Sequence, residues 1–325
     1  MEAKIKNRVI GVDISLDTTS YAIVDVRGNI IARSGFPTRD YPSVSEYIGE
    51  LSERVVMLAE QNGGYETIRS MGISAPSANN LTGCIENPPN LDWKGVIPIA
   101  AMLRDRMGIA VALGNDAHLA GLGEHVFGCA HGMKNFVLVT LGHGIGSFIY
   151  SNGMTHVGAD GFAGEIGHTC VVYDGRVCGC GKKGCLEAYC GARGIVKTAQ
   201  ELMEQSDRPT LMRSVERLTP KAIAECCEQG DEMAIEVFGN SGRLLGLAMA
   251  GYASVLDPEA IVFSGGMSKA AHWYLEPAYE EFQKHVYFQK RGHVKFLCSA
   301  LDDHERDVLG ASALAWGIKE YSLFK

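Results

Sequence analysis

Several features are missing from this sequence of 325 residues, and each absence excludes a class of protein. No apolar run reaches the roughly 18 residues that a membrane span requires. Residues 1–8 lead directly into an apolar strand-like segment, without the apolar core of a signal peptide. Basic residues are outnumbered, 30 Lys and Arg against 38 Asp and Glu, and the net charge is −8. This balance argues against a large nucleic-acid or anionic-membrane surface, so we expect a cytoplasmic protein without either partner.

A linker rich in Pro, Ser or Gly is also missing, although the chain is long enough for one large domain or two ordinary ones. The apolar residues make up 46% of the chain and the charged residues 21%, which is typical of a globular protein with a substantial core.

Two halves of the chain show the same order of predicted elements, strands first and then alternating helices and strands. In the first half these are strands at 9–15, 20–25 and 30–32, a helix at 43–62, a strand at 68–75, a helix at 98–107 and a strand at 109–113. In the second half they are strands at 135–141 and 146–150, helices at 192–203, 219–229 and 231–255, a strand at 260–264, a further helix, a strand at 294–298 and a helix at 308–316.

This order predicts an α/β protein with two domains and a cleft between them. We assign residues 1–117 to the first domain, joined by the C-terminal helix at 308–325, and residues 118–307 to the second. A short hinge is expected within residues 116–128. Thr219 is predicted to cap the helix that starts with Pro220.

One histidine and three cysteines give the strongest functional signal. They are His168, Cys178, Cys180 and Cys185, in a glycine-rich stretch. Three thiolates and one imidazole complete a tetrahedral Zn²⁺ site, and no position is left for water, so a structural role is expected. The other seven cysteines are scattered, and we interpret most of them as small buried hydrophobic residues in a reducing compartment.

Carboxylates near strand ends and beside the zinc cluster are candidate catalytic groups. Asn115 and Asp116 follow a buried strand, where a carboxylate facing a cleft can act as a general base. The same pair is typical of a turn or a helix cap. Glu165 and Glu187 flank the zinc ligands, and each is also compatible with a solvated position or with a contact to a metal ligand.

Two glycine turns are candidates for binding phosphate. The turn from Gly142 through His143 and Gly144 joins two predicted strands and can present backbone N–H groups to phosphate oxygens. Gly265 and Gly266 lie between a strand and a helix, where a nucleotide can approach the backbone. Each motif alone is also compatible with an ordinary tight turn.

These motifs, in this order, resemble the ROK family of sugar kinases and sugar-responsive repressors, which has the actin-like, hexokinase-type ATPase fold. The most specific part is residues 164–168 with residues 178–187, which resemble the family's zinc and sugar signature. The other matching segments are the second phosphate motif at 139–146, the segment of the catalytic aspartate at 115–117, a sugar-contacting loop at 90–93 and the adenosine motif at 265–266. The resemblance implies two actin-like ATPase (ribonuclease H-like) domains with an inter-domain cleft.

The resemblance also implies a role for each residue. Asp116 is the general base that takes a proton from a sugar hydroxyl, which then attacks the γ-phosphate of Mg-ATP. The sugar is held by Asn90, Asn115, Asp116, Glu165, His168 and Glu187. The nucleotide is held by Asp13, Thr18, Gly142, His143, Gly144, Gly265 and Gly266. Zn²⁺ on His168, Cys178, Cys180 and Cys185 is a structural brace, Mg²⁺ accompanies ATP, and relatives suggest a homodimer.

The nucleotide half departs from the family pattern. The first phosphate motif is usually Asp-x-Gly-Gly-Thr-Lys, and here Asp13 is followed by Ile14-Ser15-Leu16-Asp17. Thr18 or Thr19 can substitute for the threonine after a small shift. A carboxylate at Asp17 repels a triphosphate unless Mg²⁺ or a turn away from the site absorbs its charge. His143 stands where threonine is common in the second motif.

The leading hypothesis is an ATP:hexose phosphotransferase similar to glucokinase. Glucose is favoured by its frequency in the family, while N-acetylmannosamine, N-acetylglucosamine, fructose and allose stay open. The alternative is a sugar-binding regulator or sensor of the same family without kinase activity. The family's repressors carry an additional N-terminal DNA-binding segment, for which the residues before Val9 leave no room, so a DNA-binding domain is not expected.

Overall fold

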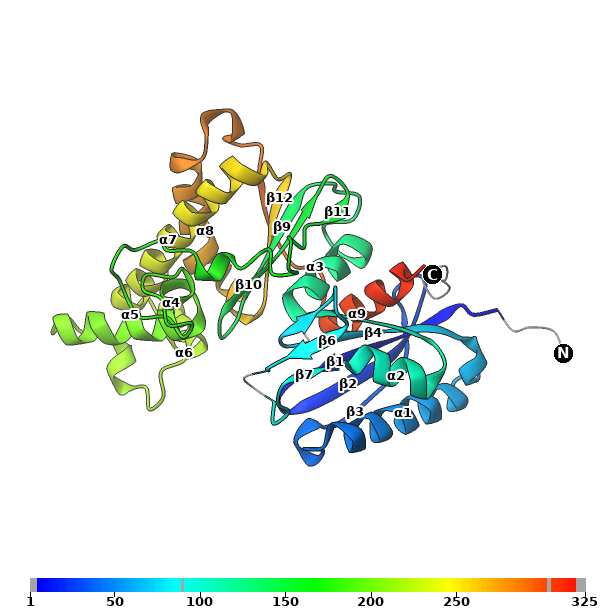
Figure 1. The fold of residues 1–325 in the computed structure, drawn as a ribbon. Coiled ribbons are helices and arrows are strands. Elements are labelled where there is room, and N and C mark those ends of the chain that lie inside the picture. Colours follow the sequence, from blue (N-terminus) through cyan, green and yellow to red (C-terminus); the bar gives the residue numbers. More distant parts are fainter. Residues whose placement is uncertain (1–4, 89–90, 303–304, 320–325) are drawn as a thin grey trace. The chain divides into compact units, whose positions relative to one another are not determined.

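The computed structural model describes residues 5–88, 91–302 and 305–319, and the chain forms two compact units (Figure 1). Unit 1 comprises Met1–Gly132, Val157–Phe162 and Ala300–Lys325, and unit 2 comprises Met133–His156 and Ala163–Ser299. Both units combine a five-stranded sheet with helices, which confirms the expected α/β class. The units differ from the predicted division, because unit 1 continues beyond residue 117 to Gly132.

The two sheets have the same topology. In unit 1 the strand order is β3-β2-β1-β4-β8, and in unit 2 it is β11-β10-β9-β12-β13. Each sheet has an antiparallel three-strand meander extended by two strands parallel to its first strand. The strands of unit 1 are β1 (Arg8–Ile14), β2 (Thr18–Asp25), β3 (Ile30–Pro37), β4 (Ile68–Ala75) and β8 (Ala110–Asn115). Those of unit 2 are β9 (Phe136–Leu141), β10 (Ile145–Ser151), β11 (Met154–Thr155), β12 (Ala260–Ser264) and β13 (Lys295–Cys298).

Alternation along β1 gives the sheet of unit 1 two buried faces. Ile10 and Val12 belong to the core formed with α1 (Val44–Gln61) and α2 (Ile99–Met107). Gly11 points to the other face, where α9 (Arg306–Gly317) packs so closely that a side chain at Gly11 would overlap the Val308 carbonyl. Figure 1 shows α1 and α9 on opposite faces of this sheet.

The segment predicted as a hinge is a helix, α3 (Asp116–Phe127), so that prediction was wrong. The Asn115 side chain accepts a hydrogen bond from the Ala117 N–H at 3.0 Å and caps the helix. A Cβ at Gly123 would lie only 3.2 Å from Gly310 of α9, so the two helices touch through small residues. Because α9 supplies this contact from the far end of the chain, α3 belongs to unit 1.

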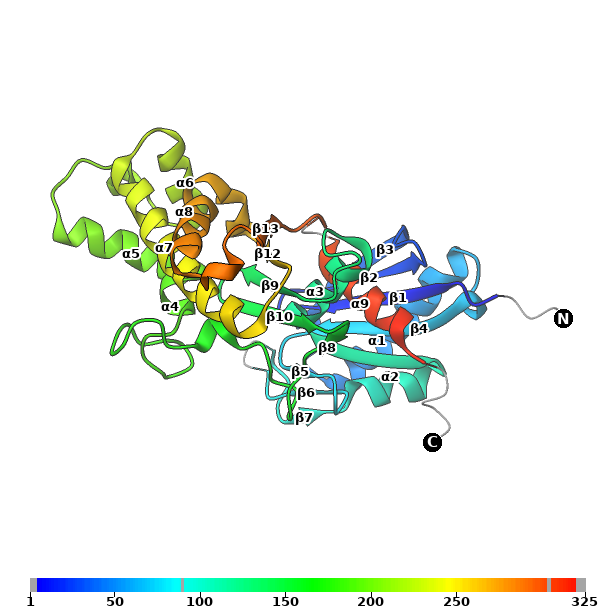
Figure 2. The same ribbon diagram turned by 90° about the horizontal axis from the view of Figure 1, so that it is seen from above.

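In unit 2 the helices pack on the sheet and around one long central helix (Figure 2). They are α4 (Glu187–Cys190), α5 (Ala192–Gln205), α6 (Pro220–Glu228), α7 (Glu232–Leu256) and α8 (Ala271–His285). The predicted cap of α6 is confirmed, because Thr219 Oγ1 accepts the Ala222 N–H at 3.1 Å. Gly242 and Gly246 let α7 approach the backbone of α8, because a Cβ at either would overlap a carbonyl oxygen of α8.

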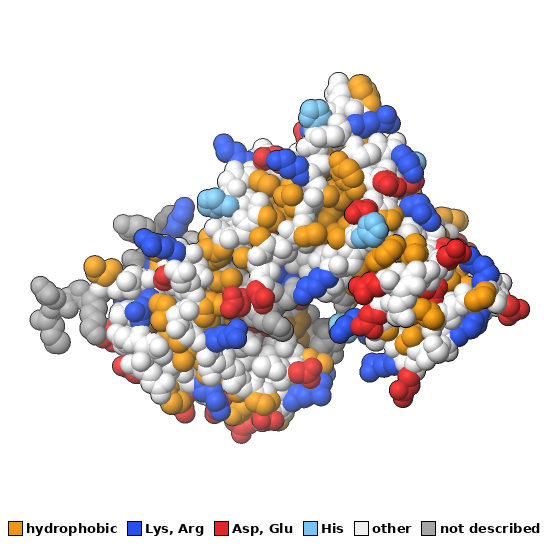
Figure 3. All heavy atoms as spheres, turned by 180° about the vertical axis from the view of Figure 1, so that it is seen from behind, with side chains coloured by type: hydrophobic (Ala, Val, Ile, Leu, Met, Phe, Trp, Pro, Cys, Tyr) orange, Lys and Arg blue, Asp and Glu red, His pale blue; other side chains and the backbone are white. Residues whose placement is uncertain are grey.

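A third, small sheet lies where the sequence predicts only a loop. Its strands are β5 (Ala78–Asn79), β6 (Cys84–Glu86) and β7 (Val96–Ile97). None of the helices in the described residues is both long and apolar enough to cross a membrane. On the face drawn in Figure 3, Lys and Arg side chains are interspersed with Asp and Glu, and the described residues there form no continuous basic surface.

Candidate functional site

The carboxyl ends of β1, β4 and β8 bring three predicted site residues of unit 1 to one edge of its sheet. Asp13 is the register partner of Ser74, and Ala75 is the register partner of Asn115. Asp116 follows Asn115 as the first residue of α3. Ligands of open α/β sheets bind at this edge, so the position agrees with a role in binding or catalysis.

A further carboxylate, Asp307 in the first turn of α9, joins this edge and was missed by sequence reasoning. Along β4, the Ser70 hydroxyl donates to the Ala315 carbonyl at 2.9 Å, and Gly72 faces Ala311. Four residues of a helix rise about 6 Å and two residues of a strand about 6.6 Å, so every two residues of β4 match four residues of α9. Two residues after Gly72 comes Ser74, and four residues before Ala311 comes Asp307, so these two residues lie side by side. The sequence carried no motif that could identify Asp307, because only the packing of α9 brings it here.

Two carboxyl groups at this edge, those of Asp13 and Asp116, have a raised pKa. The pKa of Asp13 is raised to about 7, chiefly by burial and then by the charges of Asp307 and Asp116, while Ser74 and Arg306 act in the opposite direction. Burial also raises the pKa of Asp116, with a contribution from Asp307, while the Ala117 N–H, which donates to Asp116 at 2.7 Å, lowers it. Arg306 pairs with Asp307 at 2.9 Å. Asp116 is exposed as a residue, while the chain packed around its carboxyl group is dense enough to raise its pKa.

The altered phosphate motif forms a tight turn between β1 and β2. The Ser15 hydroxyl donates to the Thr18 carbonyl at 2.7 Å. Asp17 forms an ion pair with Arg39 at 2.9 Å, so its negative charge has a partner. Thr18 is exposed, whereas Thr19 is buried and its hydroxyl bonds to the hydroxyls of Thr38 and Tyr47. Of the two threonines, only Thr18 is accessible to a ligand. Asn90 lies outside the described residues.

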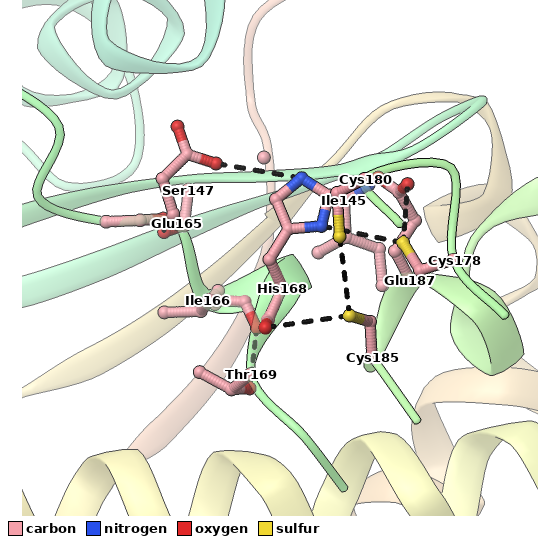
Figure 4. A network of polar contacts seen from close by, with 12 residues as sticks. Ile145, Ser147, Glu165, Ile166, His168, Thr169, Cys178, Cys180, Cys185 and Glu187 are labelled. Carbon is pink, nitrogen blue, oxygen red and sulfur yellow. Dashed lines mark hydrogen bonds and ion pairs between the residues drawn. The ribbon is translucent and has the colours of Figure 1, made fainter. Parts of the chain in front are cut away.

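In unit 2, the four predicted zinc ligands converge (Figure 4). The donor atoms of His168, Cys178, Cys180 and Cys185 all lie within 4.8 Å of one another. A tetrahedral site with Zn–S bonds of about 2.3 Å and a Zn–N bond of about 2.0 Å has S–S edges of about 3.8 Å and S–N edges of about 3.5 Å. The Sγ atoms of Cys180 and Cys185 are 3.7 Å apart, and Cys178 Sγ lies 3.6 Å from His168 Nδ1. The donor set and its spacing therefore fit zinc.

The two flanking glutamates differ in their surroundings. Glu165 is exposed and lies 4.0 Å from His168 Nε2, the ring nitrogen that does not face the cysteines (Figure 4). Glu187 is half-buried, and one of its carboxylate oxygens accepts the Ile145 N–H at 2.9 Å. Its other oxygen lies 3.8 Å from Cys178 Sγ. Glu187 thus connects the cluster of His168 and the three cysteines to the turn between β9 and β10.

That turn and the second glycine motif lie at neighbouring strand ends. β12 runs parallel to β9 with Ser264 opposite Thr140, so Gly265 and Gly142 follow at the same edge. The residues Gly142 and His143 are exposed. Gly265 has φ of +91°, and a Cβ there would lie 2.6 Å from the Leu141 carbonyl oxygen, so the close approach requires glycine.

A half-buried arginine holds the cysteine loop against α5. The Arg176 guanidinium donates to the carbonyls of Ala188 and Gly194 at 3.1 and 3.2 Å and forms an ion pair with Glu201. It also lies over the Tyr189 ring, 4.5 Å from the centroid. These contacts fix the chain two residues before Cys178, so the loop has support in addition to any metal.

The prediction that most of the other seven cysteines are buried is confirmed. Four of the seven are buried as expected, namely Cys84, Cys190, Cys226 and Cys227. Cys129 is half-buried, and Cys170 and Cys298 are exposed. The sequence surroundings of Cys170, which is followed by two valines, gave no indication of this exposure.

Comparisons with known proteins agree with this arrangement. The sequence matches the model of the ROK family over residues 9–318. A glucokinase from Halalkalibacterium halodurans is 31% identical over 283 residues, which cover 85% of this chain and 86% of that protein. A xylose repressor from Caldicellulosiruptor bescii is 25% identical, and the match covers 94% of this chain and 77% of the repressor.

Solved structures share the fold. The structure is similar to that of a ROK family glucokinase from Streptomyces griseus in complex with glucose and AMPPNP. The TM-score is 0.74, the identity is 29%, and the match covers 95% of this chain and 99% of that one.

Proposed function

The chain belongs to the ROK family, and we propose that it is a sugar kinase that transfers the γ-phosphate of ATP to a hexose, with glucose as the first candidate. The curated glucokinase relative and the Streptomyces griseus glucokinase, solved with glucose and an ATP analogue, support this class of reaction. The observation that carries the proposal is the position of Asp116 at the carboxyl edge of the sheet in unit 1, as an exposed residue whose carboxyl group has a raised pKa.

In this proposal Asp116 acts as the general base. A base works best when its pKa approaches the working pH, and burial and Asp307 both move Asp116 in that direction. Asn115 and Asn90, with Glu165, His168 and Glu187, are proposed to hold the other sugar hydroxyls. Asp13, Thr18 and the two glycine turns are proposed to face the nucleotide, for which Mg²⁺ supplies charge neutralisation.

The zinc ion is proposed to be structural. His168, Cys178, Cys180 and Cys185 use all four tetrahedral positions, so the ion has no place for a reacting water. Its proposed role is to order the loop that contains Glu165 and His168. The Glu165 carboxylate and the Nε2 atom of His168 face away from the sulfur atoms.

A sugar-binding regulator without kinase activity is the second candidate. The xylose repressor relative and the altered residues Ser15, Leu16 and Asp17 favour it. The ion pair between Asp17 and Arg39 favours the kinase, because it offsets the negative charge that the altered turn introduces.

Turnover and binding must be measured together. A coupled assay of ADP release over hexoses and N-acetylhexosamines is expected to show sugar-dependent ATP consumption. Asp116→Asn should lower kcat by about 10²–10⁴-fold, the usual contribution of a general base, while calorimetry still detects sugar binding. Asp105→Asn, an exposed aspartate of α2, serves as the matched control and should leave kcat unchanged. Clear sugar binding without turnover of any sugar by the parent protein would overturn the kinase and support the regulator.

A further inference from the structure

Cys170 is an exposed cysteine that neither the metal site nor the proposed reaction uses. It lies opposite the zinc ligand Cys185 in a short antiparallel bridge. The Val171 N–H donates to the Gly184 carbonyl at 2.8 Å, and the Leu186 N–H donates to the Thr169 carbonyl at 3.0 Å. These two bonds flank the pair of cysteines, so Cys170 and Cys185 form a non-hydrogen-bonded pair.

This kind of pair has a spacing that suits a disulfide. The Cα atoms of a non-hydrogen-bonded pair lie about 4.5 Å apart with their side chains on the same face. Disulfides accept Cα separations of about 4.4–6.8 Å. A Cβ at Gly184 would overlap the Val172 carbonyl oxygen and lie 3.0 Å from Cys170 Sγ, so the Cys170 sulfur lies beside the residue that precedes Cys185.

We propose that Cys170 is a peroxide-reactive thiol that forms a disulfide with Cys185 and thereby removes one ligand from the zinc site. Peroxide oxidises the Cys170 thiol to a sulfenic acid and is reduced to one water. The Cys185 sulfur then attacks the Cys170 sulfur, and the sulfenic oxygen leaves as a second water. Two thiols lose two electrons in total, and the peroxide gains them.

The exposures of the two sulfurs determine which one reacts first. Cys185 is fully buried, whereas Cys170 is open to solvent, so an oxidant reaches Cys170 first. After the disulfide forms, only His168, Cys178 and Cys180 remain as protein ligands. The loss of one anionic thiolate weakens the attraction between the site and the Zn²⁺ cation. We therefore expect zinc release to accompany the disulfide, one ion for each bond formed. This consequence rests on the proposed zinc site.

The positions of Lys and Arg make the bond easy to assign. Trypsin places Cys170 alone on the peptide 135–176, Cys178 and Cys180 together on 177–182, and Cys185 with Cys190 on 184–193. The folded, zinc-loaded protein is treated with hydrogen peroxide, zinc release is followed with a chromogenic chelator, and the digest is analysed by mass spectrometry. A linkage of 135–176 to 184–193, with fragment ions at Cys185, is expected, together with loss of zinc that reductant and added zinc reverse.

Two variants test whether Cys170 is the thiol that peroxide attacks. Cys170→Ser should bind zinc as the parent does and retain it under the same peroxide exposure. Cys298→Ser removes an exposed thiol of unit 2 that lies outside the segment 168–185, and this variant should release zinc like the parent. A linkage confined to 177–182 and 184–193, or equal zinc loss from Cys170→Ser, would overturn the proposal. Parent protein purified without zinc would instead contradict the metal site itself.

Discussion

Replacing Gly72 by alanine tests the packing that brings α9 to the carboxyl edge of the sheet in unit 1. A Cβ at Gly72 would overlap the Ala311 carbonyl oxygen and lie 3.0 Å from the Ala315 nitrogen. Both obstacles are backbone atoms of a helix, so neither can rotate away as the end of a side chain would. The helix has to move from the sheet to admit the methyl group.

The expected loss in the free energy of unfolding has two contributions. Overpacking of a well-packed site typically costs 1–3 kcal/mol. The same movement stretches the buried hydrogen bond from Ser70 to the Ala315 carbonyl, 2.9 Å long, and such a bond contributes about 1 kcal/mol. Together these contributions predict that Gly72→Ala lowers the free energy of unfolding by about 3 kcal/mol.

Urea denaturation followed by tryptophan fluorescence measures this change, because Trp93 and Trp316 both lie in unit 1 and Trp316 is part of α9. Gly49→Ala in α1 is the matched control, since its Cβ would meet only the end of the Arg106 side chain at 3.8 Å. That variant should be stabilised by up to about 1 kcal/mol through helix propensity. If Gly72→Ala unfolds within about 0.5 kcal/mol of the parent, the usual spread for neutral surface changes, the close packing of α9 is refuted.

Other perturbations test the charges and the metal. Because the folded pKa of Asp13 is raised from 3.8 to about 7, its ionisation destabilises the folded state increasingly as pH rises between these values, and fully above them. Asp13→Asn should therefore raise the urea midpoint more at pH 8 than at pH 5, and an equal shift at both would contradict the assignment. Elemental analysis should find one zinc per chain in the parent and none in Cys180→Ser, whereas a metal-free and fully folded parent would exclude the zinc site. A strong chelator should lower the unfolding temperature of the parent and leave that of Cys180→Ser unchanged, as seen by calorimetry.

The local sequence pattern was sufficient to predict an element where the pattern lies within that element. The strands β4 and β12 begin and end at the predicted residues, because short apolar runs bounded by polar or glycine residues define buried strands well. Thr219 with Pro220 located the start of α6 for the same reason. The spacing of the cysteines predicted a cluster that the structure brings together, since a glycine-rich loop folds locally.

Local pattern failed where distant segments decide the structure. A hinge was predicted within residues 116–128 because no linker separates the two halves, but Asp116–Phe127 form α3, in which Gly123 lets α9 pack closely through Gly310. Asp307 and Cys170 could not be recognised as members of a site, because each acquires its neighbours through pairing with a segment that local sequence does not reveal. Thr19 was offered as a phosphate ligand, and only the fold shows its hydroxyl engaged by Thr38 and Tyr47.

Glu187 gives the two motifs of unit 2 a common member. One oxygen accepts the Ile145 N–H in the turn after β9, and the other lies beside Cys178, a predicted zinc ligand. A ligand that reorients the turn and a metal ion that binds Cys178 would therefore both act on the Glu187 carboxylate. Thermodynamic reciprocity then requires equal coupling in both directions. If metal binding changes the affinity of the turn for its ligand by some factor, binding of that ligand must change the affinity for the metal by the same factor.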